Sequence, residues 1–383
     1  MTTVVVAGAI GSKAGNGGEA WVRPSWVLGF RRLGFEVHMV EQLDPAVCSD
    51  ADGLPVDWGE SINGAFFRDV VARFGLSDVA TLVVPGVDRA VGLSFAEVRE
   101  LLGSAGALVN ISGNLDLEGL VGAAPLSVYV DLDPVYSQVW HATGRLGGHL
   151  GRHDHHVTVG RNVDRLDRLT PGIRWRATAP PVLLEEWPVG DDAPAPVFTT
   201  VASWRGPFGP LELDGRALGR KAHEFRRMIP LPGMVEWPME IALDIDPADQ
   251  ADLDSLRGAG WRVVDPRGVA ATPGAFRDYV RGSGAEFSVA QGAYVDTCSG
   301  WLSDRTAHYL ASGRPALVQD TGAALGRGEG LVTFRTIHEA AAGAARITGD
   351  YAVHREAARE LAERHFDSDL VLARLAEEVG LAP

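Results

Sequence analysis

Two carboxylates stand two residues apart at the end of an apolar run, where Asp131 and Asp133 close the segment LSVYVDLD and Pro134 follows. The run at residues 126–134 predicts a buried strand, along which alternate side chains point to the same face. Ligands of open α/β sheets bind beyond the carboxyl ends of the strands, so this pair is placed to act on a ligand or to hold a metal. An acidic residue before proline is equally typical of a helix cap, which leaves both roles open for Asp133.

A second candidate site lies in residues 299–321, which predict a loop, a short helix and a buried strand. Ser303 and Asp304 can both cap this helix. A helix N-terminus attracts anions because its unpaired N–H groups and its dipole point the same way. Arg305 falls in the first turn, where the dipole disfavours a cation unless an anion binds nearby. The pattern therefore indicates a phosphate-like ligand, although an ordinary crossover with a surface arginine has the same spacing.

A glycine-rich loop follows the first predicted strand, residues 3–7, and leads into a helix that starts near Glu19. Its glycines do not fit GxGxxG, and Glu41 lies too far along the chain to hold a ribose in the usual way, so NAD or FAD binding is not favoured. Glycine lets the backbone approach a ligand closely. The candidate contacts to an acceptor are Gly11, Gly17, Gly18 and Trp21. Trp21 fits a core position equally well.

Metal and disulfide chemistry have little support in the sequence. His153, His155 and His156 resemble a metal cluster, but no nearby carboxylate would orient them, and we expect them to lead into a strand at 156–159. The two cysteines lie far apart and form no CxxC pattern, so neither a disulfide nor a zinc site is predicted. We expect no metal and no cofactor.

The composition is that of a globular protein, with 46% hydrophobic and 22% charged residues and a net charge of −15. No block of Lys and Arg stands out, which argues against a nucleic-acid partner. No run approaches 18 apolar residues, and no signal peptide is visible, so we expect no membrane span and a cytoplasmic protein. A monomer and a homodimer both remain open.

Strands and helices alternate in both halves of the 383-residue chain, which predicts two doubly wound α/β domains. A proline-rich segment, 181–196, separates residues 1–180 from residues 197–365. The last residues, 366–383, predict a helix that packs back on the first domain. Two such Rossmann-like domains face each other across a cleft, where small ligands usually bind.

The segments TTVASWRG, at 199–206, and SGWLSDRTAHYLASGRPALVQDTG, at 299–322, resemble the GT-B glycosyltransferases, in particular group 1 transferases that include spore-maturation-protein-like members. The resemblance is clearest over roughly 197–370. It implies a nucleotide-sugar donor, UDP- or dTDP-linked, held by the second domain without a metal. It also implies a small-molecule acceptor held by the first domain, in keeping with specialised metabolism.

The resemblance assigns roles to particular residues. Cations near a breaking glycosidic bond stabilise the charge that grows on the diphosphate. The strand end Ser203-Trp204-Arg205 matches the loop that meets the diphosphate, and Lys221 falls near the lysine of the family. The backbone around Val264 and Asp265 is where the base would lie. The remaining donor contacts implied are Ser299, Gly300, Ser303, Asp304, Arg305 and His308.

The sequence departs from the retaining members of that family, which carry two glutamates at the positions of Gly300 and His308. An inverting enzyme would need a general base, for which Asp133, Asp131 and Glu19 are the candidates. Two alternatives remain, a nucleotide-sugar epimerase on the same fold and a catalytically silent scaffold or spore-coat protein.

Overall fold

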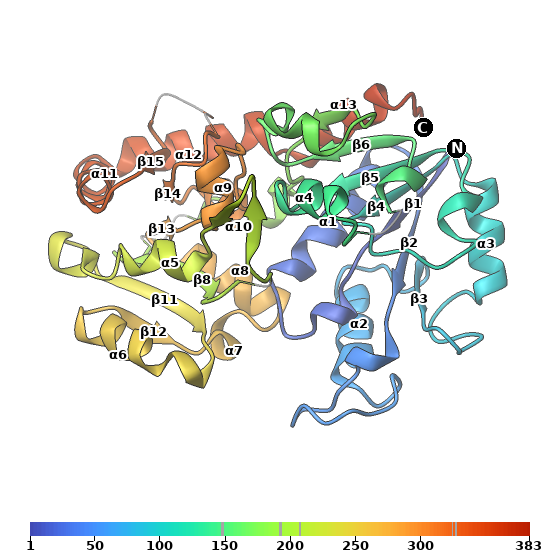
Figure 1. Ribbon diagram of the computed structural model, residues 1–383, viewed down its shortest axis with the longest axis horizontal. Helices are drawn as coiled ribbons and strands as arrows, with labels where there is room; N and C mark the ends of the chain where they lie inside the picture. The colour runs from blue at the N-terminus through green and yellow to red at the C-terminus, as the bar shows by residue number, and fades with distance from the viewer. Residues whose placement is uncertain (147–148, 191–193, 207, 324, 326–327) are drawn as a thin grey trace.

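The chain forms two parallel sheets, of seven and six strands, each flanked by helices (Figure 1). The computed structural model describes residues 1–146, 149–190, 194–206, 208–323, 325 and 328–383. The predicted architecture of two doubly wound α/β domains is confirmed. Part of the predicted linker, residues 191–193, lies outside the described residues.

The first sheet has the strand order β3-β2-β1-β4-β5-β6-β7. Its short apolar strands are buried on both faces, as parallel strands covered by helices must be. The order reverses between β1 and β4, which is the point where such sheets bind ligands. The strands are β1 Thr3–Ala7, β2 Glu36–Gln42, β3 Ala80–Val83, β4 Ala107–Ile111, β5 Ser127–Asp131, β6 His155–Thr158 and β7 Trp175–Ala177, and the helices are α1 Glu19–Arg32, α2 Ile62–Arg73, α3 Phe95–Ser104 and α4 Tyr136–Ala142.

The second sheet has the order β12-β11-β8-β13-β14-β15 and reverses between β8 and β13. Its strands are β8 Phe198–Ser203, β11 Met239–Asp244, β12 Arg262–Val264, β13 Ala285–Ser288, β14 Ala316–Gln319 and β15 Leu331–Phe334. A separate hairpin pairs β9 Leu211–Leu213 with β10 Arg216–Leu218. The helices of this half are α5 Lys221–Arg226, α6 Gln250–Gly258, α7 Pro266–Val269, α8 Pro273–Gly282, α9 Gly292–Thr297, α10 Asp304–Ala311 and α11 Ile337–Gly349.

Two C-terminal helices, α12 Tyr351–His365 and α13 Ser368–Glu378, carry the chain back to the first domain (Figure 1). Helix α12 packs on α10, and α13 packs on α1. Gly29 of α1 allows this approach, because a Cβ there would lie 2.5 Å from Leu372 of α13. A short bridge between Val182 and Asp367 joins the two crossing segments.

The N-terminal end of α1 is inserted against the second domain. Trp21 is fully buried, and its indole N–H donates to the carbonyl of Pro273 at 2.8 Å. Its ring packs at 5.0 Å from Trp187 and 4.9 Å from Phe74, measured between ring centroids. This shared core ties the glycine-rich loop to the second domain.

The sequence pattern predicts most of the long elements but neither the β9–β10 hairpin nor the short helices α4 and α9. These elements have three to seven residues each, which is too short for a hydrophobic period to show. Within the described parts of the chain, no helix combines the length and the apolar character that crossing a bilayer requires.

Candidate active site

Two neighbouring cavities open where the domains meet, one of about 900 Å³ and one of about 380 Å³. We call them cavity 1 and cavity 2. The two cavities adjoin, because six residues line both of them. The residues that line both are Lys13, Glu19, Lys221, Ser303, Asp304 and Arg305.

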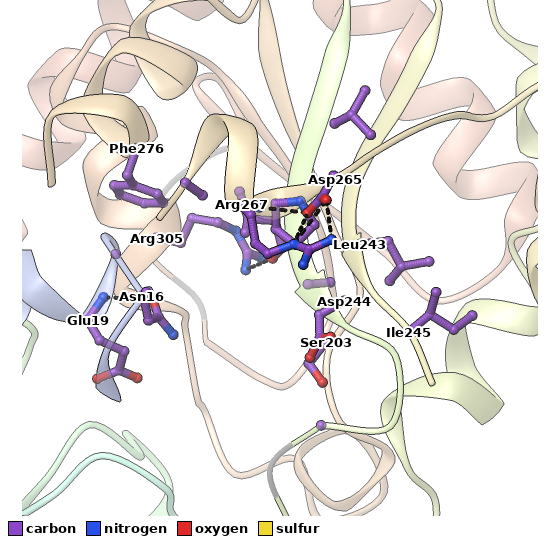
Figure 2. Close-up of a pocket in the computed structure, with 18 of the residues that line it drawn as sticks. Asn16, Glu19, Ser203, Leu243, Asp244, Ile245, Asp265, Arg267, Phe276 and Arg305 are labelled. Atoms are coloured by element: carbon purple, nitrogen blue, oxygen red, sulfur yellow. Dashed lines mark hydrogen bonds and ion pairs between the residues drawn. The ribbon is translucent and has the colours of Figure 1, made fainter. Parts of the chain in front are cut away.

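Cavity 1 lies beyond the carboxyl ends of β8, β11 and β12, with the N-terminus of α10 at one side. Figure 2 shows Asn16 of the glycine-rich loop and Glu19 of α1 on the side opposite the apolar Leu243 and Ile245. The predicted donor residues Ser203, Val264, Asp265, Ser303, Asp304 and Arg305 all line this cavity, as does Gly18. Asp265 caps α7 and pairs with Arg267, so its carboxylate is held in place.

Lys221 begins α5 and lines both cavities. Its backbone N–H donates to the Gln291 side chain at 2.7 Å. The loop before α5 touches the start of α9 because glycine stands at both positions: a Cβ on Gly292 would lie 2.5 Å from the Cα of Gly219. Burial, reinforced by the charge of Arg305, lowers the pKa of Lys221 to about 8. Its ammonium makes no hydrogen bond or ion pair with the described residues, so it is available to an anionic ligand.

The sequence contains just two lysines, Lys13 and Lys221, and both line both cavities. Arginine supplies the other basic side chains. Lysine is a compact point charge whose pKa shifts readily, whereas arginine stays charged. The positions of the two lysines therefore mark the shared wall as a place for anions.

Arg305 lines the same wall but is held by three hydrogen bonds. Its guanidinium donates to Glu286 at 2.8 Å, to the Val201 carbonyl at 2.7 Å and to Ser288 at 2.8 Å. The Glu286 carboxylate balances its charge. Arg305 therefore joins α10 to strands β8 and β13. A ligand can bind only to those N–H groups of its guanidinium that these three hydrogen bonds do not use.

Cavity 2 contains the carboxylate of Asp133, half-buried in the loop after β5. The hydroxyl of Tyr294 donates to it at 2.9 Å. Burial and, next, the neighbouring Asp131 carboxylate raise the pKa of Asp133 to about 6. A carboxylate with a pKa near neutrality is suited to take a proton from a ligand.

Asp131 has a different environment from Asp133, although only one residue separates them. It is fully buried, and its oxygens accept hydrogen bonds from Ser137 at 2.6 Å, Gln138 at 3.0 Å and Thr158 at 2.8 Å. It lines neither cavity. Asp131 therefore organises the start of α4, and this placement corrects its candidacy as a general base.

Glu19 lines both cavities at the first turn of α1. Its carboxylate accepts a hydrogen bond from the buried Arg23, one turn further along. Arg23 lines cavity 2, and its Nε has no partner among the described residues. Since Glu19 is engaged in an ion pair, Asp133 is the better placed of the two to accept a proton.

Three residues predicted to contact a donor lie away from both cavities. Trp204 is buried, and its indole N–H donates to a carboxylate of α6. His308 is buried and stacks on Trp187, with ring centroids 4.4 Å apart. Arg205 lies on the surface in a two-bond ion pair with Asp249. None of the three lines either cavity, because packing or a local carboxylate holds each side chain away.

The predicted loop contacts also need correction. The carbonyls of Ser299 and Gly300 accept backbone hydrogen bonds from residues 161–162 of the first domain, outside both cavities. Gly11 donates its N–H to the buried Glu41 at 2.8 Å. Gly17 donates to the Ala270 carbonyl at 2.8 Å. These residues and Trp21 hold the loop and the domains together, because their backbone or indole groups are occupied by protein partners.

Several lining residues were missed from the sequence, among them Lys13, Arg23, Gln291 and Tyr294. The rarity of lysine was the one signal that could have found Lys13. His153 and His156 pack against Tyr129 and Trp175 as part of an aromatic cluster. Over the described parts of the chain, no group of three His, Cys, Asp or Glu residues could hold a metal ion.

Comparisons with known proteins identify the fold. No protein-family model matches the sequence, and no curated protein matches it. Solved structures match over nearly the whole chain. An alpha-glucosyltransferase in complex with UDP and DNA aligns with a TM-score of 0.60 at 12% identity, covering 99% of both chains. Anabaena HepE in complex with UDP and glucose aligns with a TM-score of 0.61 at 11% identity, covering 99% of this chain and 100% of that one.

A third similar structure is a putative UDP-N-acetylglucosamine 2-epimerase from Listeria monocytogenes, with a TM-score of 0.52 at 12% identity, covering 99% of this chain and 96% of that one. At such identities the likeness concerns the fold. The protein therefore has the two-domain GT-B fold that the sequence motifs predicted.

Proposed function

We propose that the protein transfers a sugar from a nucleoside-diphosphate donor to a small-molecule acceptor. The observation that carries this proposal is the pair of cavities that meet at Lys13, Lys221 and the N-terminus of α10. A transferase must bring the acceptor hydroxyl into contact with the sugar of the donor, at the carbon from which the diphosphate departs. An epimerase needs no second cavity.

The donor is assigned to cavity 1. Its volume of about 900 Å³ lies in the range of pockets that bury a ligand of this size. The nucleobase would lie against Val264 and the apolar side chains of β11, and the diphosphate against Lys221 and the first N–H groups of α10. Cations and helix dipoles can meet the phosphate charge there, so no metal is required. UDP and dTDP are the proposed carriers.

In the transfer step, Asp133 takes the proton of an acceptor hydroxyl. The acceptor oxygen forms a bond to the anomeric carbon, and the bond from that carbon to the diphosphate oxygen breaks. The nucleoside diphosphate leaves with the electron pair, and the ammonium of Lys221 stabilises its new charge. Asp133 must be ionised and Lys221 protonated, which their pKa values of about 6 and about 8 permit near pH 7.

The test combines binding with turnover. Titration calorimetry with UDP, dTDP, GDP and ADP should show selective binding of one diphosphate. Mass spectrometry with the matching sugar donor and a set of hydroxylated acceptors should then show transfer. Asp133→Asn should keep the diphosphate affinity within about twofold and lower kcat at least about 100-fold, in the range that general-base catalysis contributes.

Three outcomes would contradict the proposal. Conversion of the donor without an acceptor would indicate an epimerase. Absence of binding to every diphosphate would favour a silent scaffold. Unchanged turnover in Asp133→Asn would remove Asp133 from the mechanism.

A further inference from the structure

Cavity 2 is lined by several aromatic side chains, whereas Phe276 is the only aromatic residue among the described residues that line cavity 1. The aromatic residues of cavity 2 are Tyr129, Trp140, Phe208, Tyr294 and Trp301. The first two belong to the first domain and the other three to the second. We call these five residues the aromatic wall. Both domains contribute to it, so neither domain forms it alone.

Four of these five rings form two pairs. Tyr294 and Trp301 are stacked, with centroids 4.5 Å apart and an angle of 27° between their planes. Phe208 and Trp140 meet edge to face at 4.9 Å and 85°. Trp140, Phe208 and Trp301 are each only partly buried, so they keep apolar surface open to the cavity. Large aromatic side chains left open in a cavity are typical of a site that binds an apolar or planar molecule.

We propose that the acceptor is a planar, hydroxylated aromatic molecule of two or three rings, bound against Trp140, Phe208 and Trp301 with its hydroxyl at Asp133. This inference rests on the proposed function, since it names the acceptor of that reaction. The volume of about 380 Å³ agrees with the size, because a cavity of about 150 Å³ is filled by a single benzene ring. Asp133 lines the same cavity and is held by Tyr294, itself a member of the stacked pair.

The charges around the cavity also favour a phenolic hydroxyl. A phenol ionises near pH 10, several units below water, so a carboxylate base deprotonates it more readily than an aliphatic alcohol. Lys13, Arg23 and Lys221 line the cavity and would stabilise the phenolate that forms. Asp133, Glu19 and Asp304 carry the opposing charges, of which Glu19 is paired with Arg23.

The experiment is equilibrium dialysis of the whole protein, saturated with UDP, against three probes. 4-Methylumbelliferone and 2-naphthol are planar phenols, and methyl β-glucoside is a sugar. We expect both phenols to bind and to compete with each other. We expect Trp140→Ala and Trp301→Ala each to weaken phenol binding about tenfold.

Trp58→Ala is the matched control, because Trp58 is also half-buried in the first domain but lines neither cavity. It should change phenol affinity by less than about twofold. Trp140→Leu, which keeps more of the volume, replaces Trp140→Ala if the latter fails to fold. UDP affinity, measured in the same variants, should stay unchanged.

Failure of both phenols to bind, while UDP binds, would overturn the acceptor assignment and leave the transferase proposal intact. Tighter binding of methyl β-glucoside than of the phenols would assign a sugar acceptor and also overturn it. Equal weakening in the Trp58 control would show that the aromatic wall does not act specifically. Loss of UDP binding in the unmodified protein would instead contradict the proposed function.

Discussion

Lys221 should titrate near pH 8 and should control the affinity for a nucleoside diphosphate. The sequence has only two lysines, so reductive methylation with ¹³C-formaldehyde labels only Lys13, Lys221 and the N-terminal amine, and it preserves their charge. Lys221→Arg assigns the Lys221 resonance by removing it. Its pH titration in free protein should have a midpoint near 8, compared with about 10.4 for an ordinary lysine.

UDP should raise the pKa of Lys221, because the phosphate favours the charged ammonium. A hydrogen bond to a charged group contributes roughly 1.5–3 kcal/mol, which corresponds to about one to two pKa units. Linkage then requires the protonated protein to bind UDP more tightly by the same factor. Starting from a pKa of about 8, UDP affinity should fall about five- to tenfold between pH 7 and pH 9.

The assay is titration calorimetry with UDP at several pH values from 7 to 9. Lys221→Arg is the matched control, since arginine stays charged throughout this range and should give a nearly flat profile. Lys221→Met should lower the affinity about 10- to 100-fold at pH 7. A Lys221 midpoint near 10.4, together with a flat UDP profile in the unmodified protein, would refute the assignment of this lysine to the diphosphate.

Two further predictions concern the base and the domain contact. Tyr294→Phe removes the hydrogen bond that lowers the pKa of Asp133. The acidic limb of the kcat/KM profile should therefore move to higher pH by about one unit. A shift to lower pH would exclude this contact from catalysis. Gly17→Ala would place a Cβ 2.1 Å from a carbonyl oxygen of the second domain and should lower the free energy of unfolding by about 1–3 kcal/mol. Gly233→Ala is its control, because a Cβ there would meet no atom of the other described residues within 4 Å, apart from its chain neighbours. Equal loss of stability in denaturant melts of both variants would contradict the close approach.

Much of the fold could be predicted from the sequence, because short apolar runs and their alternation with helices are local signals. The runs TVVVA and ALVN predict buried parallel strands, and β1 and β4 are such strands. Ser61 and Ser94 are of a residue type that favours helix N-caps, and their side chains cap α2 and α3. Such features depend on neighbours within a few residues, so no tertiary information is needed.

The candidate site was only partly predictable, because the state of a charge depends on partners that are distant in sequence. Arg305 of α10 is the predicted anion contact, yet Glu286 of β13 engages it. Asp131 and Asp133 have the same residue type and nearly the same position, but three side chains hold one while the other lines a cavity.

The amino-acid sequence by itself determined the two α/β halves, the order of their main elements and the charged residues at the strand ends that are candidates for the site. Only the tertiary structure decided which of these residues meet. It brings Trp21 to Pro273, and it places Lys13 and Lys221 among the residues that line both cavities. The physical reason is that burial and charge pairing act through space, between domains whose contact no local pattern records.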